Sequence, residues 1–297
     1  MSALLLLLAC SGADPEDSAE DTQPPPPMEH LYSFAILADP HITANLDPQE
    51  RLAAAVSWIN ENAADRGIEL VWVVGDIGWG DGLPISRSLL DALEVPYVPV
   101  IGDNEIHFGD EQTFDDVFGP QFDTLAGSLD DWQRGAVEVF NPEHDRLSWF
   151  YNFSFTYGGL RWVGLDWCSR YDGILGELAD VHDFEGGTLP FFASQIAPLE
   201  AGPEEDVLLF SHHPMHIGAF DEAEMAAITG LTGPVGGRIA GAWAGHLHLN
   251  ATVDVDDAGY TAWVTDAVWD DLITVRVVEV HGNGISHEYV QELVVVE

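Results

Sequence analysis

Five short segments of the chain place aspartate, histidine or asparagine directly after an apolar run. They are Asp39-Pro40-His41, Gly75-Asp76, Gly102-Asp103-Asn104, Ser211-His212-His213 and Gly245-His246-Leu247-His248. Imidazole nitrogens and carboxylate oxygens are ligands that borderline divalent metals accept. Because alternate side chains of an extended backbone point the same way, His246 and His248 are expected to face one side. Seven or eight such groups are too many for one ion, and they predict two metal ions that share a carboxylate.

The apolar runs before these segments have the composition of buried strands. Residues 68–74 are β-branched and almost continuously hydrophobic, which is typical of a strand buried on both faces. Gly75 then allows a sharp turn, which lifts Asp76 off the carboxyl edge of the sheet, where ligands bind in open α/β sheets. The other runs are 31–38, 97–101, 207–210 and 239–244. Five strands that deliver such side chains to one edge predict a single shared site.

The connections between the strands predict a parallel α/β arrangement. Asp47-Pro48 is expected to cap a helix that ends at Gly67, and a strand, a helix and a second strand imply a right-handed crossover. A shorter helix is expected over 84–93, and Asp221 and Glu224 predict the capping box of a helix that runs to 228.

Other parts of the chain give weaker or different patterns. Residues 160–165 predict another strand. The runs 251–255 with 260–265, and 272–280 with 285–296, predict antiparallel pairs. Residues 106–151 show poor periodicity, and we expect a long excursion there that forms one wall of the substrate site.

The composition excludes several classes of function. The chain has 51 acidic residues against nine basic ones, a formal net charge of −42, and every basic residue is arginine. Without lysine there is no Schiff-base catalysis and no phosphate-binding lysine loop. Nucleic acid is not expected as a bulk partner because no basic face can be assembled. With 297 residues, 46% of them hydrophobic, the chain can bury a sizeable core.

The five segments, in this order, resemble the five motifs of the calcineurin-like metallophosphoesterases. The resemblance rests on Asp39-x-His41, Gly75-Asp76, Gly102-Asp103-Asn104-Glu105, His212 before Pro214, and Gly245-His246-x-His248. It implies an α/β fold, a four-layer αββα sandwich of two mixed sheets, with two divalent ions (Mn, Fe or Zn) at the strand C-terminal ends. In that pattern one metal takes Asp39, His41, Asp76 and His248. The other takes Asp76, the third-motif residue, His212 and His246.

The third motif departs from the family pattern, which usually reads Gly-Asn-His followed by an acidic residue. Asp103 and Asn104 occupy the Asn and His positions. Asp103 can bind a metal, whereas Asn104 cannot donate a proton at a useful pKa, so the general acid is open. His107 and His213 are the candidate substitutes, with ordinary surface or core histidines as the alternative. If the register is shifted by one residue, Asn104 itself is the ligand.

Two further comparisons with the family concern a subfamily and a possible substrate contact. Purple acid phosphatases lack a histidine in the first motif and carry a tyrosine three residues after the bridging aspartate, whereas this chain has His41 and Trp79. The chain is therefore not expected to belong to that subfamily. Asp166 and Arg170 are candidate substrate-binding residues, and a capping aspartate and a surface arginine are the plainer interpretation.

The first 27 residues differ in composition from the rest. Residues 1–10 end in Leu7-Leu8-Ala9-Cys10, which resembles the lipobox of bacterial lipoproteins, and the apolar part is too short to span a bilayer. Residues 11–27 are acidic and proline-rich and predict a disordered tether before a domain over 28–297. We expect lipidation at Cys10 in the bacterial cell envelope, at the outer membrane or periplasmic face, with the anchor as the membrane contact. Secretion is the alternative.

Together these features predict a metal-dependent phosphoester hydrolase. The resemblance implies in-line attack on phosphorus by a hydroxide that bridges the two ions. The four positive charges of two divalent ions are balanced by Asp39, Asp76, Asp103 and the hydroxide. A small phosphodiester is therefore favoured over a dianionic phosphomonoester. A non-catalytic surface lipoprotein with a degenerate, metal-binding site is the alternative, because Asn104 replaces the expected acid.

Overall fold

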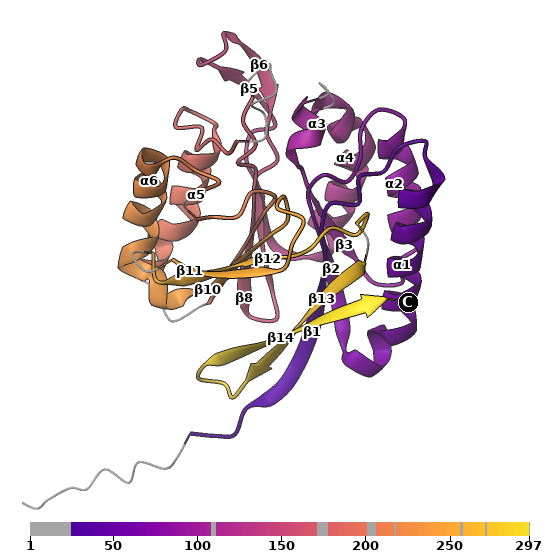
Figure 1. Cartoon of the computed structure of the whole chain (residues 1–297). Coiled ribbons are helices and arrows are strands. Elements are labelled where there is room, and N and C mark those ends of the chain that lie inside the picture. The colour runs from indigo at the N-terminus through magenta and orange to yellow at the C-terminus, as the bar shows by residue number, and fades with distance from the viewer. Residues whose placement is uncertain are drawn as a thin grey trace, which may run out of the picture.

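Two large mixed sheets lie face to face with helices on both outer sides (Figure 1). The computed structural model of the protein describes residues 25–107, 111–170, 178–200, 206–216, 218–255, 258–270 and 272–296. The predicted αββα sandwich is confirmed. Cys10 and most of the predicted tether lie outside the described residues.

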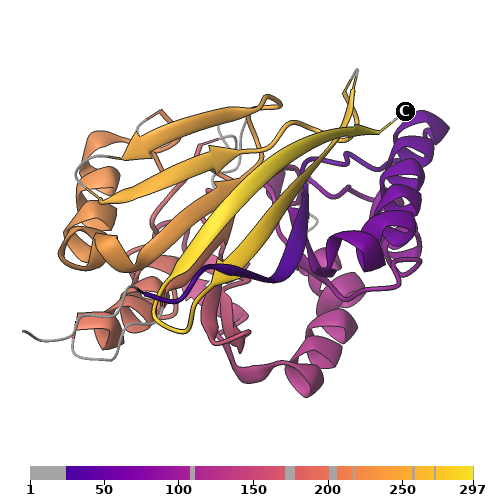
Figure 2. The ribbon, with the colours of Figure 1, turned by 90° about the horizontal axis from the view of Figure 1, so that it is seen from below.

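The first sheet has five strands in the order β14-β13-β1-β2-β3. The neighbours β1, β2 and β3 run parallel, and β13 runs antiparallel to both β1 and β14. The bounds are β1 (Glu29–Leu37), β2 (Ile68–Val74), β3 (Tyr97–Val100), β13 (Ile273–Gly282) and β14 (His287–Val296). Figure 2 shows the β13–β14 hairpin beside the N-terminal strand on the lower side of the molecule.

The second sheet has seven strands in the order β11-β12-β10-β9-β8-β7-β4. Its centre is parallel: β9 pairs with β8 and β10, and β10 pairs with β12. The edge strand β11 pairs antiparallel with β12. The bounds are β4 (Asp130–Arg134), β7 (Phe153–Tyr157), β8 (Leu160–Leu165), β9 (Val207–Ser211), β10 (Ile239–Ala244), β11 (Ala251–Val255) and β12 (Tyr260–Val264). A separate two-stranded hairpin joins β5 (Glu138–Asn141) to β6 (Arg146–Trp149).

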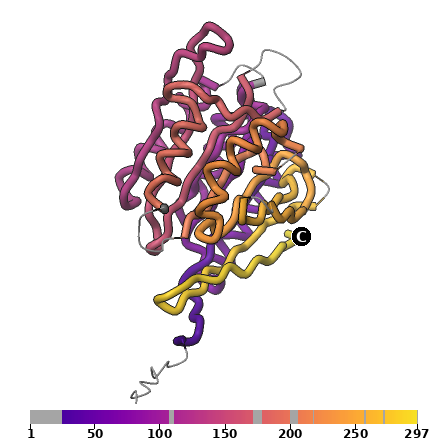
Figure 3. Tube along the Cα trace, turned by 90° about the vertical axis from the view of Figure 1, so that its left-hand side faces the viewer, coloured from indigo at the N-terminus to yellow at the C-terminus, as the bar shows by residue number. Residues whose placement is uncertain are grey.

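The helices divide between the two outer faces (Figures 1 and 3). The first group lies beside the first sheet and comprises α1 (Leu46–Arg66), α2 (Gly82–Leu90), α3 (Asp103–His107) and α4 (Glu111–Ser128). The second group covers the second sheet and comprises α5 (Thr188–Ile196) and α6 (Glu222–Thr232), each followed by a short 3-10 helix at Ala197–Glu200 and Gly233–Arg238. In the described residues, no helix combines the length and the apolarity that crossing a bilayer requires.

The predicted caps of two helices agree with the structure to different degrees. The N-cap of α1 is Asn45, whose side chain accepts a hydrogen bond from the Asp47 backbone at 3.3 Å, so the prediction of Asp47 as the cap is wrong by two residues. At its end, Gly67 takes the left-handed conformation with φ 65°. The capping box of Asp221 and Glu224 forms as predicted, but α6 continues to Thr232.

Residues 106–151, where poor periodicity predicts a long excursion, instead contain regular helix and strands. Residues 111–128 form the helix α4, which buries Phe114, Phe118, Phe122 and Leu125 on one face. These residues recur at intervals of three or four, which is the helical period. Pro120 lies inside this helix and, with the surrounding Asp and Gly residues, weakens the sequence pattern.

Large aromatic side chains fill the space between the two sheets. The rings of Trp72 on β2 and Phe210 on β9 stack with centroids 3.7 Å apart, and Trp162 on β8 lies parallel to both. All three are fully buried. This packing fixes the two sheets relative to one another, because aromatic rings bury large areas in a defined geometry. Side chains at the ends of strands from both sheets can therefore share one site.

Candidate metal centre

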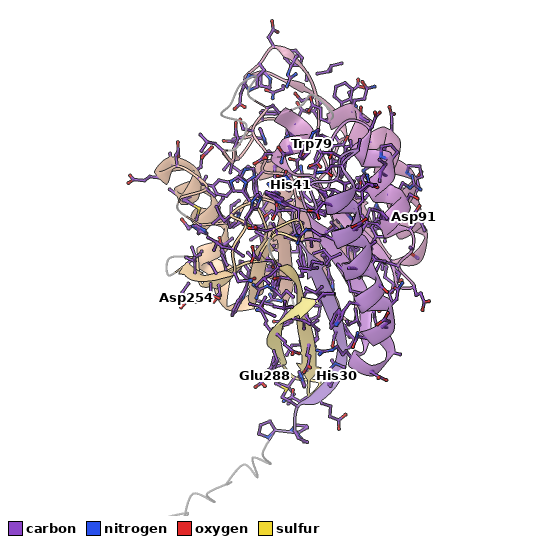
Figure 4. The ribbon with its side chains drawn as sticks, turned by 45° about the vertical axis from the view of Figure 1, so that its right-hand side comes forward. His30, His41, Trp79, Asp91, Asp254 and Glu288 are labelled. Atoms are coloured by element: carbon purple, nitrogen blue, oxygen red, sulfur yellow. The ribbon has the colours of Figure 1, made fainter. Side chains whose placement is uncertain are left out.

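The predicted ligands meet at the carboxyl ends of β1, β2, β3, β9 and β10. Within each of two groups, one ligand atom per residue lies within 4.8 Å of the others. The first group is Asp39, His41, Asp76 and His248, and the second is Asp103, His212 and His246. Figure 4 shows His41 and Trp79 near this end of the molecule, away from His30 and Glu288 at the opposite end.

Asp76 lies between the two groups. Its Oδ2 lies 3.3 Å from Nε2 of His41, and its Oδ1 lies 3.4 Å from Nε2 of His212. One carboxylate oxygen therefore faces each group. This is the arrangement in which a carboxylate can bridge two cations.

In the second group, a backbone hydrogen bond identifies which ring nitrogen of His212 can bind a metal. His212 Nδ1 lies 3.2 Å from the Val74 carbonyl oxygen, which can only accept, so Nδ1 carries the proton. His212 Nε2 is then the ligand atom, and it lies 3.5 Å from Asp103 Oδ2 and 3.3 Å from His246 Nδ1. A backbone carbonyl that fixes the tautomer of an imidazole is a common feature of metal sites.

The backbone is strained at most of these ligands. Five of them have positive φ although none is glycine: Asp39 (48°), His41 (51°), Asp76 (48°), His246 (69°) and His248 (49°). Such conformations cost on the order of 1–3 kcal/mol each and persist where the surroundings impose them, often at functional sites. Here they turn the chain just past β1, β2 and β10, where these ligands meet.

Two glycines make room for the ligands. A Cβ on Gly75, where φ is 84°, would lie 2.3 Å from His212 Nδ1. A Cβ on Gly102 would lie 2.0 Å from the backbone nitrogen of Asp76. Both distances are well below van der Waals contact, so the ligand positions require glycine.

Burial perturbs the ligand carboxylates and imidazoles. It raises the pKa of Asp76 to about 6 and that of Asp39 well above its usual value. The same burial lowers the pKa of His41 to about 3, which keeps its imidazole neutral and able to bind a metal. In the described part of the chain, these carboxylates form ion pairs only with histidines.

The second group contains the opposite shifts. Burial alone would raise the pKa of Asp103, but the close approach of the His212 and His246 imidazoles holds it well below its usual range. Burial likewise opposes charge on His212, yet Asp76 and Asp103 raise its pKa well above the usual value. The buried carboxylates thus favour positive charge among them, which a bound cation or a second proton on an imidazole can supply.

Two buried ligand atoms make no hydrogen bond to any described residue. They are Nε2 of His41 and Oδ2 of Asp103, although Asp76 Oδ2 and His246 Nδ1 lie 3.3 and 3.0 Å from them. Such orphaned atoms cost free energy unless something binds them. Together with the mixed nitrogen and oxygen donors, they fit two divalent cations.

The third-motif residues separate into two positions. Asp103 lies in the second group, whereas the Asn104 side chain donates from Nδ2 to Asp76 Oδ2 at 2.5 Å. His213 is fully buried behind Asp103, with its Nε2 3.6 Å from Asp103 Oδ2. His107 ends α3, but its side chain lies outside the described residues.

The expectation for Asp166 and Arg170 needs correction. Both side chains are 0% exposed, and Arg170 binds Asp166 through two contacts of 2.5 and 3.1 Å. Arg170 Nε lies 3.0 Å from Glu111 Oε2, and its guanidinium covers the Phe150 ring at 4.3 Å. Arg170 is therefore a core residue and not a surface arginine. Neither side chain offers a face on which a substrate could lie.

Two residues of the site were not predicted from the sequence. Glu105 is fully buried and accepts hydrogen bonds from the backbone of Gly78 at 2.9 Å and Gly102 at 2.7 Å, which ties the β2 and β3 ends together. Its place in the third motif was a signal for such a role. Trp269 is 38% exposed, with its ring 5.3 Å from His41 and 5.7 Å from His248. Nothing in the spacing around Trp269 marks it.

Neither a protein-family model nor a curated protein sequence matches the chain. Among solved structures, it is similar to a purple acid phosphatase isolated from yellow lupin (Lupinus luteus) seeds, with a TM-score of 0.45 and 15% identity. The similarity covers 87% of this chain and 51% of that one, so the chain spans about half the length of the plant protein. At this level of similarity, no function is carried over.

Proposed function

We propose that the protein is a phosphoester hydrolase that uses two divalent cations, Mn, Fe or Zn, bound at the strand ends. One observation carries the proposal: seven side chains from five strand ends form two ligand groups, and one of the seven, Asp76, lies between the groups. When bound, two divalent cations supply an activated water for attack on phosphorus and stabilise the negative charge that develops on its oxygens.

The residues around Asp76 keep its carboxylate ionised and oriented. The Asn104 backbone donates to Oδ1 at 2.9 Å, and its side-chain amide donates to Oδ2. Hydrogen bonds to the charged form favour that form, so they oppose the effect of burial on the pKa of Asp76. Asn104 is only partly buried, and its amide can also donate a hydrogen bond to a phosphoryl oxygen.

The charge and the walls of the site favour a small phosphodiester. Asp39, Asp76 and Asp103 cancel three of the four positive charges of two divalent cations, which suits a singly charged diester better than a dianionic monoester. Trp79 and Trp269 both lie against His41, with ring centroids 5.6 and 5.3 Å away. These indoles provide a surface for a flat, apolar ester group.

Proton donation to the leaving group is assigned to a residue other than Asn104. An amide has no proton to give near neutral pH, and the buried His213 packs behind Asp103. We propose His107 for this role on the basis of the sequence. Replacement of His107 by Ala is expected to slow the hydrolysis of esters with poor leaving groups more than that of esters with good leaving groups.

The sequence also supports a proposal for the location of the enzyme. A lipid on Cys10 would hold the domain at the bacterial envelope through the acidic, proline-rich tether. The substrate would then be a small phosphoester in that compartment. With a net charge of −42, nucleic acid is not proposed as a partner.

The decisive experiment compares metal-loaded wild type, Asp76→Asn and Asp65→Asn on a chromogenic diester and its matched monoester. Asp65 is an exposed residue of α1, remote from the ligands, and serves as the matched control. We expect turnover of the diester, a lower kcat/KM on the monoester, and loss of turnover in Asp76→Asn alone. If the wild type binds metals but turns over neither ester, the non-catalytic metal-binding alternative is correct.

A further inference from the structure

A histidine and two carboxylates also meet at a second place, away from the strand-end ligands. Glu143 lies in the turn between β5 and β6, and Asp180 and His182 lie in the segment before α5. One ligand atom from each residue lies within 4.8 Å of the others. His182 Nδ1 is 3.6 Å from Asp180 Oδ1 and 4.0 Å from Glu143 Oε2.

The His182 ring is fully buried, and one of its nitrogens makes no hydrogen bond to a described residue. Nε2 lies 2.9 Å from the Cys168 carbonyl oxygen, which can only accept, so Nε2 carries the proton. Nδ1 has no hydrogen-bond partner among the residues that the structure describes. The distances to the two carboxylates are beyond hydrogen-bond range, so a second proton on the ring would gain no hydrogen bond there.

The ring nitrogen therefore faces two carboxylates across a gap. A lone pair and two negative groups that face one another are unfavourable unless positive charge lies between them. The Cys168 carbonyl fixes the tautomer of His182, as the Val74 carbonyl fixes that of His212. Such a second hydrogen bond is usual for histidines that bind metals.

The backbone of this segment repeats a feature of the strand-end site. Asp180-Val181-His182 has the same spacing as Asp39-Pro40-His41. His182 has φ 49° and His41 has φ 51°, a conformation that is rare for histidine. The His182 backbone donates to Asp180 Oδ1 at 2.8 Å, which holds that carboxylate toward the ring.

We infer that Glu143, Asp180 and His182 bind a third divalent cation. One imidazole nitrogen and two carboxylates suit Zn²⁺ or Mn²⁺, whereas Ca²⁺ prefers a shell of oxygens alone. The cation joins the turn of the β5–β6 hairpin to the segment before α5. His182 also binds the Cys168 carbonyl, and Cys168 Sγ lies 3.7 Å from the Ile101 carbonyl oxygen. These contacts connect the cation site to the segment just before Asp103.

The test titrates Zn²⁺ into the full chain after chelation, by calorimetry, with excess NaCl and Mg²⁺ to saturate weak sites on the acidic surface. The variant is Glu143→Gln with Asp180→Asn, in which Asn keeps an acceptor for the His182 backbone. Glu138→Gln is the matched control, because Glu138 is exposed on β5 of the same hairpin. The wild type and the control are expected to bind one more equivalent than the double variant, and Zn²⁺ is expected to raise their Tm further.

An equal number of bound Zn²⁺ ions in all three proteins would overturn the proposal. If the double variant does not fold, Glu143→Gln alone is used, since the Glu143 side chain is 43% exposed and its loss leaves the core intact. The single variant is then expected to bind the last equivalent more weakly, and unchanged binding counts against the site. The same difference in the number of bound Zn²⁺ ions is expected when all proteins also carry Asp76→Asn. The test therefore does not depend on metal binding at the strand-end ligands.

Discussion

Asn104 donates two hydrogen bonds to Asp76, from its backbone nitrogen to Oδ1 at 2.9 Å and from its side chain to Oδ2 at 2.5 Å. Asp103, one residue earlier, turns the other way, with its Oδ2 3.0 Å from His246 Nδ1. Adjacent residues of one short helix thus have different tasks. In the proposed site, Asp103 supplies a ligand, and Asn104 orients the carboxylate between the two groups.

This division predicts different losses for two variants. Asn104→Ala removes one hydrogen bond to a charged group, worth about 1.5–3 kcal/mol, so kcat is expected to fall roughly ten- to hundredfold while metal content is retained. Asp103→Ala removes a ligand and is expected to lose bound metal. Metal analysis and steady-state kinetics on the same preparations check both. Loss of metal in Asn104→Ala, with full metal content in Asp103→Ala, would mean that Asn104 is the ligand.

Gly75→Ala is expected to damage the site, and Gly80→Ala serves as its control. Both glycines have positive φ, 84° and 54°, so alanine costs roughly 1–2 kcal/mol of backbone strain at either position. Only at Gly75 does the new Cβ meet a ligand, 2.3 Å from His212 Nδ1, whereas nothing lies within 4 Å at Gly80. We expect both variants to lose stability in urea unfolding, and only Gly75→Ala to lose metal. Equal metal content in the two would show that the ring can move aside.

Trp269→Ala is expected to weaken binding of substrates that carry an aromatic ester group. The indole lies 5.3 Å from His41 and is 38% exposed, so it can contact a substrate without supporting the core. Aromatic pairs contribute about 0.5–1.5 kcal/mol, which predicts a rise in KM of roughly two- to tenfold with little change in kcat. The control is Leu272→Ala, an exposed residue with 57% accessibility. An equal rise in KM for an ester with a small aliphatic group would argue against stacking.

The strand ends could be predicted because the signal is local. Each apolar run stops at a polar residue, often after a glycine, and parallel strands bring their carboxyl ends to one edge. Asp39 and His246 are far apart in the chain, yet the His246 backbone donates to Asp39 Oδ2 at 3.0 Å. The order of the strands was not needed for this prediction.

Contacts between distant segments could not be predicted in the same way. Nothing in the sequence around Arg170 distinguishes it from a surface arginine. Its burial against Glu111 on α4 makes it a core residue. The helix α4 was not predicted because Pro120 and the surrounding Asp and Gly residues weaken its helical pattern, although its phenylalanines keep the helical spacing. The spacing of His182 from Asp180 matches that of His41 from Asp39, but nothing in the sequence places Glu143 beside them.

The buried ion pairs of Arg170 predict a large loss of stability when this residue is replaced. Arg170→Met leaves the buried carboxylate of Asp166 without its guanidinium partner, and leaves the buried carboxylate of Glu111 with Arg146 at 3.6 Å. Removal of one member of a buried ion pair costs about 3–5 kcal/mol, because the remaining charge stays out of water. Urea unfolding of the full chain measures this loss as a lower midpoint.

Arg66→Met is the matched control, because Arg66 also pairs with one carboxylate, Glu292, at 2.6 Å. Its side chain is 32% exposed and that of Glu292 is 57% exposed, so solvent screens the pair and its loss is expected to cost about 0–1 kcal/mol. The two variants lose the same charge, so a larger loss in Arg170→Met reflects the burial and the greater number of its ion pairs. Equal midpoints would mean that the carboxylates around Arg170 take up protons or water when the guanidinium is absent.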